Sequence, residues 1–95
     1  KYYQSLLLMP DRLIPDWFAT SADQITPEHL LELAGYEPQV LLLGTGEQHE
    51  FLHPRIFAPL MELGIGYEVM ATGAACRTYN VLLSEDRKVL AALIP

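Results

Sequence analysis

The residues with the most chemical potential in this chain lie between Thr72 and Asn80, a polar and thiol cluster inside an otherwise apolar run. Cys76 and Arg77 are neighbours near the expected start of a helix, where helix amides and a guanidinium favour a thiolate. Nucleophilic catalysis also needs a base, and the sequence places none of its histidines beside the thiol. A lone cysteine among alanines is more often a small packing residue. Packing is therefore the preferred interpretation of Cys76, and no catalytic residue is assigned.

The other polar residues of the cluster also have structural interpretations. Thr72, Thr78 and Asn80 are of the types that cap helices and satisfy buried backbone groups. Arg77 is expected to pair with an acid such as Glu68 or Glu85. The less favoured alternative is an exposed guanidinium at the helix start that binds an anion.

A second candidate is the turn Gly44-Thr45-Gly46, which follows a buried apolar run. The third glycine of a dinucleotide-binding fingerprint would fall at position 49, which is His49, and no Gly-Lys-Ser/Thr phosphate loop follows. Glycines at the carboxyl end of a strand still allow a tight turn and let amides approach an anion. A structural turn is favoured over a ligand cradle.

The letters His49-Glu50-Phe51-Leu52-His53 match the zinc-protease motif His-Glu-x-x-His. That chemistry needs a helix to bring the two imidazoles together, whereas Pro54 pushes His53 out of the helical region. A third ligand would also have to fit into a small chain. We therefore expect a solvated loop here, with no metal site, and no motif implies a cofactor.

Composition limits the classes of function. The chain has 95 residues, 51% of them hydrophobic and 19% charged, which predicts one domain with a substantial core. The net charge of −6 argues against nucleic acid and against an anionic membrane surface as partners. One cysteine and no apolar run long enough for a membrane span fit a reducing, cytoplasmic location. Lys1 stands in the middle of an expected strand, so we expect some N-terminal residues to be missing.

The elements that would position these candidates alternate in type. Thr26-Pro27-Glu28 has the residue types of a helix start. Gly64 is of the type that ends a helix, here the one expected to begin at Pro54. The Ala-rich helix is apolar on nearly every side and is expected to lie between layers, whereas residues 13–17 read as irregular backbone. This order predicts an α/β sandwich with a largely parallel central sheet. The expected strands are 5–9, 40–43, 65–70 and 87–94, and the expected helices are 26–35, 54–64 and 74–83.

Aromatic side chains offer a last candidate, an apolar surface. A domain this small does not always bury all of its rings, and those left outside would form a protein-binding patch. Core packing is the preferred interpretation for most of them. The rings concerned are Tyr2, Tyr3, Trp17, Phe18 and Tyr36.

Four blocks of the sequence carry a resemblance, namely residues 40–46, 64–72, 74–83 and 85–94. Together they resemble a family of small uncharacterised α/β domains of bacteria and archaea. Its eukaryotic members include a mitochondrial respiratory complex I assembly factor and an adipogenesis-associated protein. The resemblance implies a three-layer α/β sandwich with a mixed central sheet, flanking helices and a β-hairpin layer, partly supplied by residues before Lys1. It implies no established enzyme activity.

Two hypotheses of function follow. The first is a non-enzymatic protein-interaction or assembly-factor-like module with a protein partner. The alternative is a small-molecule or anion binder, or a thiol enzyme, that uses the Gly44 to Gly46 turn with Cys76 and Arg77. The resemblance implies that the family's characteristic positions converge at the carboxyl ends of the central strands, where open α/β sheets bind ligands. These positions are Gly44, Thr45, Gly46, Glu68, Thr72, Cys76, Arg77, Thr78 and Asn80.

Overall fold

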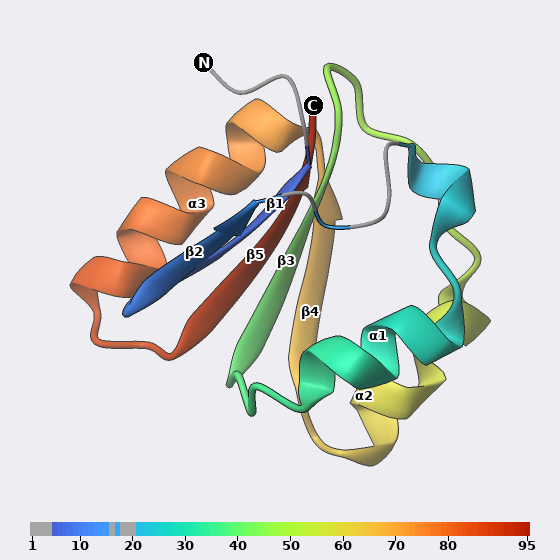
Figure 1. Ribbon diagram of the computed structural model, residues 1–95, viewed down its shortest axis with the longest axis horizontal. Helices are drawn as coiled ribbons and strands as arrows, with labels where there is room; N and C mark the ends of the chain where they lie inside the picture. Colours follow the sequence, from blue (N-terminus) through green and yellow to red (C-terminus); the bar gives the residue numbers. More distant parts are fainter. Residues whose placement is uncertain (1–4, 16, 18–20) are drawn as a thin grey trace.

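The fold is built on one five-stranded sheet, seen in a computed structural model that describes residues 5–15, 17 and 21–95 (Figure 1). The strands lie in the order β2-β1-β5-β3-β4. β3 runs parallel to both β4 and β5, whereas β1 runs antiparallel to β5 and β2. The predicted mixed sheet is therefore confirmed, with the parallel strands β5, β3 and β4 on one side and the antiparallel hairpin of β1 and β2 on the other. The strand bounds are β1 Leu6–Met9, β2 Arg12–Pro15, β3 Val40–Thr45, β4 Gly66–Met70 and β5 Val89–Ile94.

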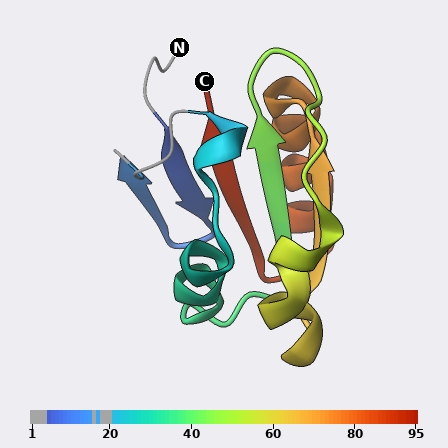
Figure 2. The same cartoon turned by 90° about the vertical axis from the view of Figure 1, so that its right-hand side faces the viewer.

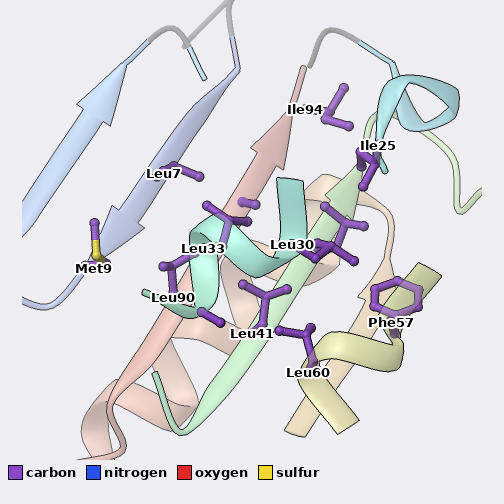
Figure 3. Packing of buried hydrophobic residues seen from close by; sticks show 13 residues of the cluster. Leu7, Met9, Ile25, Leu30, Leu33, Leu41, Phe57, Leu60, Leu90 and Ile94 are labelled. Atoms are coloured by element: carbon purple, nitrogen blue, oxygen red, sulfur yellow. The ribbon is translucent and has the colours of Figure 1, made fainter. Parts of the chain in front are cut away.

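The interior strand β3 contributes to two apolar cores, one on each face of the sheet. Leu41 and Leu43 point into the larger core, under the helices α1 (Pro27–Ala34) and α2 (Ala58–Glu62). Leu42 points into the smaller core, under α3 (Thr72–Ser84). This follows from the alternation of side chains along a strand. Figure 2 shows the two helical layers on opposite sides of the sheet, and Figure 3 shows the larger core.

Helix α1 begins where the sequence predicted. The Thr26 side chain accepts a hydrogen bond from the backbone N–H of His29 at 3.3 Å, and the Thr26 N–H donates to His29 Nδ1 at 3.2 Å. Pro27 occupies the first helical position, where its missing N–H costs nothing. The helix buries Leu30, Leu33 and Ala34 and leaves Leu31 exposed.

The second helical segment differs in part from the single helix predicted over residues 54–64. It comprises a 3-10 turn, η2 (Pro54–Phe57), followed by the short helix α2. Phe57 is buried and stacks on Tyr67 of β4 with ring centroids 4.2 Å apart. Of the face predicted to be buried, Met61 and Leu63 are exposed instead, because the segment is too short to turn all its apolar residues inward.

The prediction of irregular backbone over residues 13–17 is wrong for its first part. Arg12 to Pro15 form β2, which pairs with β1 and makes a hairpin that extends the same sheet. Pro15 is tolerated because β2 lies at the sheet edge, where one side of the strand has no ladder to break. A further 3-10 turn, η1 (Ala22–Gln24), was not predicted.

The expected position of α3 between layers is also wrong. The helix covers one face of the sheet, and only Ala75 and Tyr79 are fully buried. Val81 is 56% exposed. Alanines are small and tolerate either environment, so an Ala-rich stretch does not reveal which of its sides faces a core.

Two of the five aromatic candidates are located by the structure. Trp17 and Tyr36 are half-buried and pack against the larger core, in agreement with core packing. Tyr2, Tyr3 and Phe18 lie outside the described residues. No helix in the described part of the chain has the length and apolar content needed to cross a bilayer.

Candidate functional site

The start of α3 is joined directly to the turn after β3. β3 and β4 end at the same edge of the sheet, and α3 begins two residues after β4. Thr72 N–H donates to the Gly46 carbonyl at 2.8 Å, and Gly46 N–H donates to Thr72 Oγ1 at 2.8 Å. The Thr72 hydroxyl itself donates to the Ile94 carbonyl at the end of β5. One threonine therefore ties the carboxyl ends of three strands together.

Gly44 and Gly46 are required by this close approach. A Cβ at Gly44 would lie 2.9 Å from both Cα and Oγ1 of Thr72, a distance that real Cβ contacts do not show. Gly46 has a φ of +109°, a region that favours glycine, and a Cβ there would lie 3.1 Å from the Pro95 carbonyl oxygen. Both glycines are thus explained by packing of the protein against itself.

Thr45, between the two glycines, is 3% exposed and organises the following loop. Its hydroxyl accepts from the Glu50 N–H at 3.1 Å and lies 2.7 Å from the Gln48 carbonyl and 3.3 Å from the Met70 carbonyl. A hydroxyl has one proton to donate, and the shorter distance favours Gln48. The Gly44 to Gly46 turn is a structural turn on these contacts, as the sequence favoured.

The remaining residues of the cluster divide between two sides of α3. Thr78 is half-buried and its hydroxyl lies 3.5 Å from Met70 Sδ, so it links α3 to β4. Cys76, Arg77 and Asn80 are exposed. Their spacing of three and four residues places them on one side of a helix, away from Ala75 and Tyr79.

Two sequence interpretations of this exposed side are wrong. Cys76 is not a packing residue, because it lies on the solvent side of α3. Arg77 forms no ion pair with Glu68, Glu85 or any other acid of the described ranges. Its guanidinium lies back over Gly73, where Nη1 would be 3.6 Å from an added Cβ. The Arg77 side chain thus lies along the helix and not against a carboxylate.

The glycine turn and the exposed side of α3 differ in their surroundings. A cavity of about 270 Å³ does lie beside Thr45 and Gly46, but its charged lining residues are Glu47 and Glu50. Neither Cys76 nor Arg77 lines it. Two carboxylates repel an anion, so this edge of the sheet is poorly suited to the anion that the alternative hypothesis requires.

The His-Glu-x-x-His letters lie in a loop, as predicted. Residues 49–53 form no helix, and His53 caps η2 by accepting the Arg55 N–H on Nδ1 at 3.2 Å. Across the described ranges, His, Cys, Asp and Glu side chains form no group of three or more that could hold a metal ion.

One residue of the exposed side of α3 was not among the predicted site residues. Val81 lies one residue beyond Asn80 and four beyond Arg77, and it is 56% exposed. Its helical spacing from Arg77 would have revealed it, had the helix been expected at the surface. Glu68, the remaining predicted position, is exposed on the edge strand β4.

Fold and site together define a small α/β domain with a mixed sheet, in which one half of the motif at α3 joins strand ends and the other half faces solvent. The chain belongs to the family described as protein of unknown function (DUF498/DUF598), whose model matches residues 1–94. A crystal structure of a Bordetella parapertussis protein has the same fold, with a TM-score of 0.91 and 38% identity, covering 99% of this chain and 80% of that one.

Two named relatives are also similar to this chain. The zebrafish NADH dehydrogenase [ubiquinone] 1 alpha subcomplex assembly factor 3 is 44% identical over 84 residues, which are 86% of this chain and 48% of the relative. A protein of Francisella tularensis named 13 kDa major membrane protein is 33% identical over 70 residues, 74% of this chain and 57% of the relative. The chain thus spans about half the length of the assembly factor that it matches.

Proposed function

We propose that this chain is a protein-interaction module of the assembly-factor type, and that it binds a partner through the outward face of α3. This face consists of Cys76, Arg77, Asn80 and Val81. The observation that supports the proposal most is the division of the motif. Thr72 and Thr78 bond to groups of the sheet, whereas the outward face has no ion pair within the described part of the chain.

The composition of the outward face suits a protein contact. Arginine is enriched at protein interfaces, because its planar guanidinium makes several hydrogen bonds and stacks on rings. Val81 adds exposed apolar surface next to it. Asn80 supplies a donor and an acceptor in one side chain. When a partner covers this face, the apolar area of Val81 is buried, and Arg77 and Asn80 exchange hydrogen bonds with water for hydrogen bonds with the partner.

The relatives agree with this proposal in kind. The zebrafish protein named as an assembly factor of NADH dehydrogenase is 44% identical to this chain over the 84 aligned residues. Because the chain spans about half of that protein's length, the proposal specifies its partner only as a protein. The cytoplasmic location expected from the single cysteine is part of the same proposal.

An affinity purification of the tagged chain from its host tests the proposal. Arg77→Glu reverses a charge in the outward face. We expect the affinity for the partner to fall at least about tenfold, which is about 1.4 kcal/mol of binding free energy, and the amount of partner recovered to fall with it. Arg87→Glu is the matched control, because Arg87 is also exposed and lies beyond the end of α3. Equal recovery with both variants would refute a role of the outward face.

The alternative hypothesis, an anion binder or thiol enzyme, has one observation in its favour: the exposed thiol of Cys76 beside the exposed Arg77. It lacks the contribution of the glycine turn, which lies beside carboxylates. A thermal-shift screen against phosphates, nucleotides and carboxylates distinguishes the two. The interaction hypothesis predicts no shift, and a shift that Arg77→Glu abolishes would favour the alternative.

A further inference from the structure

We propose a second docking surface, on the opposite side of the sheet, that binds a basic amphipathic segment of a partner protein. This α1–α2 surface consists of Leu31 and Ala34 of α1, Met61 of α2, and Leu63 and Ile65 after it. The inference extends the proposed function, since it assumes that the chain works through protein contacts. It does not depend on the outward face of α3.

The α1–α2 surface is apolar and open. Leu31 is 54%, Met61 64% and Leu63 59% exposed, although the two helices that carry them pack against each other and on the core. Figures 1 and 2 show α1 and α2 side by side over the sheet. Contiguous exposed apolar side chains with a polar rim are typical of interaction sites.

A cleft lies at one end of this surface, where the end of α1 meets the segment that follows α2. Its volume is about 290 Å³, and Ala34, Leu63 and Ile65 supply its apolar wall, with Glu37 among its lining residues. Leu31 lies one helical turn from Ala34, on the same side of α1. A cleft between helices accepts a row of apolar side chains from an amphipathic segment.

The charge around the surface selects the partner. Arg55 is the single Lys or Arg between residues 13 and 76. Within the described residues the one ion pair joins Asp11 and Arg12, so the acids near α1 and α2 are not neutralised by the protein itself. The acids that lie on or next to these two helices are Glu28, Glu32, Glu37 and Glu62, all of them exposed.

This charge excludes other occupants on physical grounds. A second copy of the chain would bring two acidic surfaces together, and like charges across an interface cost several kcal/mol, on the order of what a docked patch gains. Anionic lipid and nucleic acid are repelled for the same reason. A partner segment with apolar residues at helical spacing and Lys or Arg at its flanks complements both the cleft and its rim.

The two surfaces can be occupied together. The α1–α2 surface lies over the core that contains Leu41 and Leu43, and α3 lies over the core that contains Leu42. The sheet stands between them (Figure 2). A module with this arrangement would bridge two partner proteins, or two segments of one partner.

Site-specific photo-crosslinking in the host cell tests the inference on the full-length protein. A photoreactive residue replaces Leu63, or in a separate strain Val81, and the captured peptides are sequenced. We expect the adduct at position 63 to be a net basic, amphipathic segment. A synthetic peptide of that sequence should then bind the purified chain, and its affinity should fall as salt is raised from about 50 to about 500 mM.

Paired variants complete the test. Leu31→Asp with Leu63→Asp should weaken the binding of this peptide at least about tenfold, whereas the control Leu83→Asp, at an exposed apolar residue of α3 outside both surfaces, should leave its affinity unchanged. An acidic peptide, a lipid or a second copy of this chain at position 63 would overturn the inference. Capture at 81 but none at 63 would refute the second surface and leave the proposed function standing. No capture at either position would reject both.

Discussion

Thr72 and Gly46, 26 residues apart in the chain, exchange two hydrogen bonds of 2.8 Å each. The pair closes the carboxyl edge of the parallel strands, and the Thr72 hydroxyl extends the link to the Ile94 carbonyl. The motif at the start of α3 is thereby anchored on its inner side. Its outer side takes no part in these hydrogen bonds and can bind a partner.

Thr72→Val should lower the free energy of unfolding by about 2 kcal/mol, because it leaves the Gly46 N–H and the Ile94 carbonyl without their partner. Urea denaturation followed by circular dichroism measures this loss. Thr72→Ser keeps the hydroxyl and is the matched control, with a smaller loss. Equal stability of the Val and Ser variants would show that the hydroxyl is not what closes this edge.

Gly44→Ala should destabilise the fold by about 1–3 kcal/mol, because the added Cβ meets the backbone of Thr72 at 2.9 Å. Gly66→Ala is the control within a neighbouring strand, since the nearest atom to its added Cβ lies 3.8 Å away. Thermal unfolding of the two variants gives the comparison. A Gly66 variant that loses more stability than the Gly44 variant would contradict the close approach of α3 to β3.

Cys76 should react with a water-soluble thiol reagent in the native protein, without prior unfolding, because it is exposed on α3. Cys76→Ala should change stability by less than about 0.5 kcal/mol, as is usual for surface positions. The reaction rate with and without denaturant decides the matter. Labelling that occurs only in denaturant would return Cys76 to the packing role first favoured.

Stability at alkaline pH should depend on Tyr79. Burial, with a smaller contribution from the negative charge of Asp11, raises the pKa of Tyr79 above its ordinary value of 10.0. The folded state therefore favours the neutral phenol, so its contribution to stability is complete below pH 10 and is lost as the pH rises through the folded pKa.

Tyr79→Phe removes this titration and should flatten the fall in stability above pH 10. Urea unfolding of both proteins between about pH 8 and pH 11 gives the two profiles. Parallel profiles over that range would mean that Tyr79 ionises equally easily in the folded and unfolded chains.

Much of the fold could be predicted because strong local signals agree with the tertiary structure. Val40 to Leu43 read as a strand buried on both faces and are one, and Thr26 with Pro27 starts a helix as predicted. β2 was missed because an edge strand needs little apolar pattern, and Arg12 and Leu13 are exposed. The two-sided environment of α3 was missed because its alanines carry no directional signal.

The candidate site shows the same division. The glycine turn was recognised from its place after a buried strand, and its structural role was favoured. The contact of Thr72 with Gly46 was out of reach, because it depends on the register of three strands and the start of a helix far along the chain. The exposure of Cys76 and Arg77 depends in turn on which side of α3 meets the sheet.

The central claim is that the inner side of the motif stabilises the fold and its outer side binds a partner. The most direct test measures partner recovery and the free energy of unfolding for both Thr72→Val and Arg77→Glu in one experiment. Thr72→Val should lose stability and retain the partner at temperatures where it is folded. Arg77→Glu should retain stability and lose the partner. Full partner recovery with Arg77→Glu, or a loss of stability in that variant equal to that of Thr72→Val, would contradict the account.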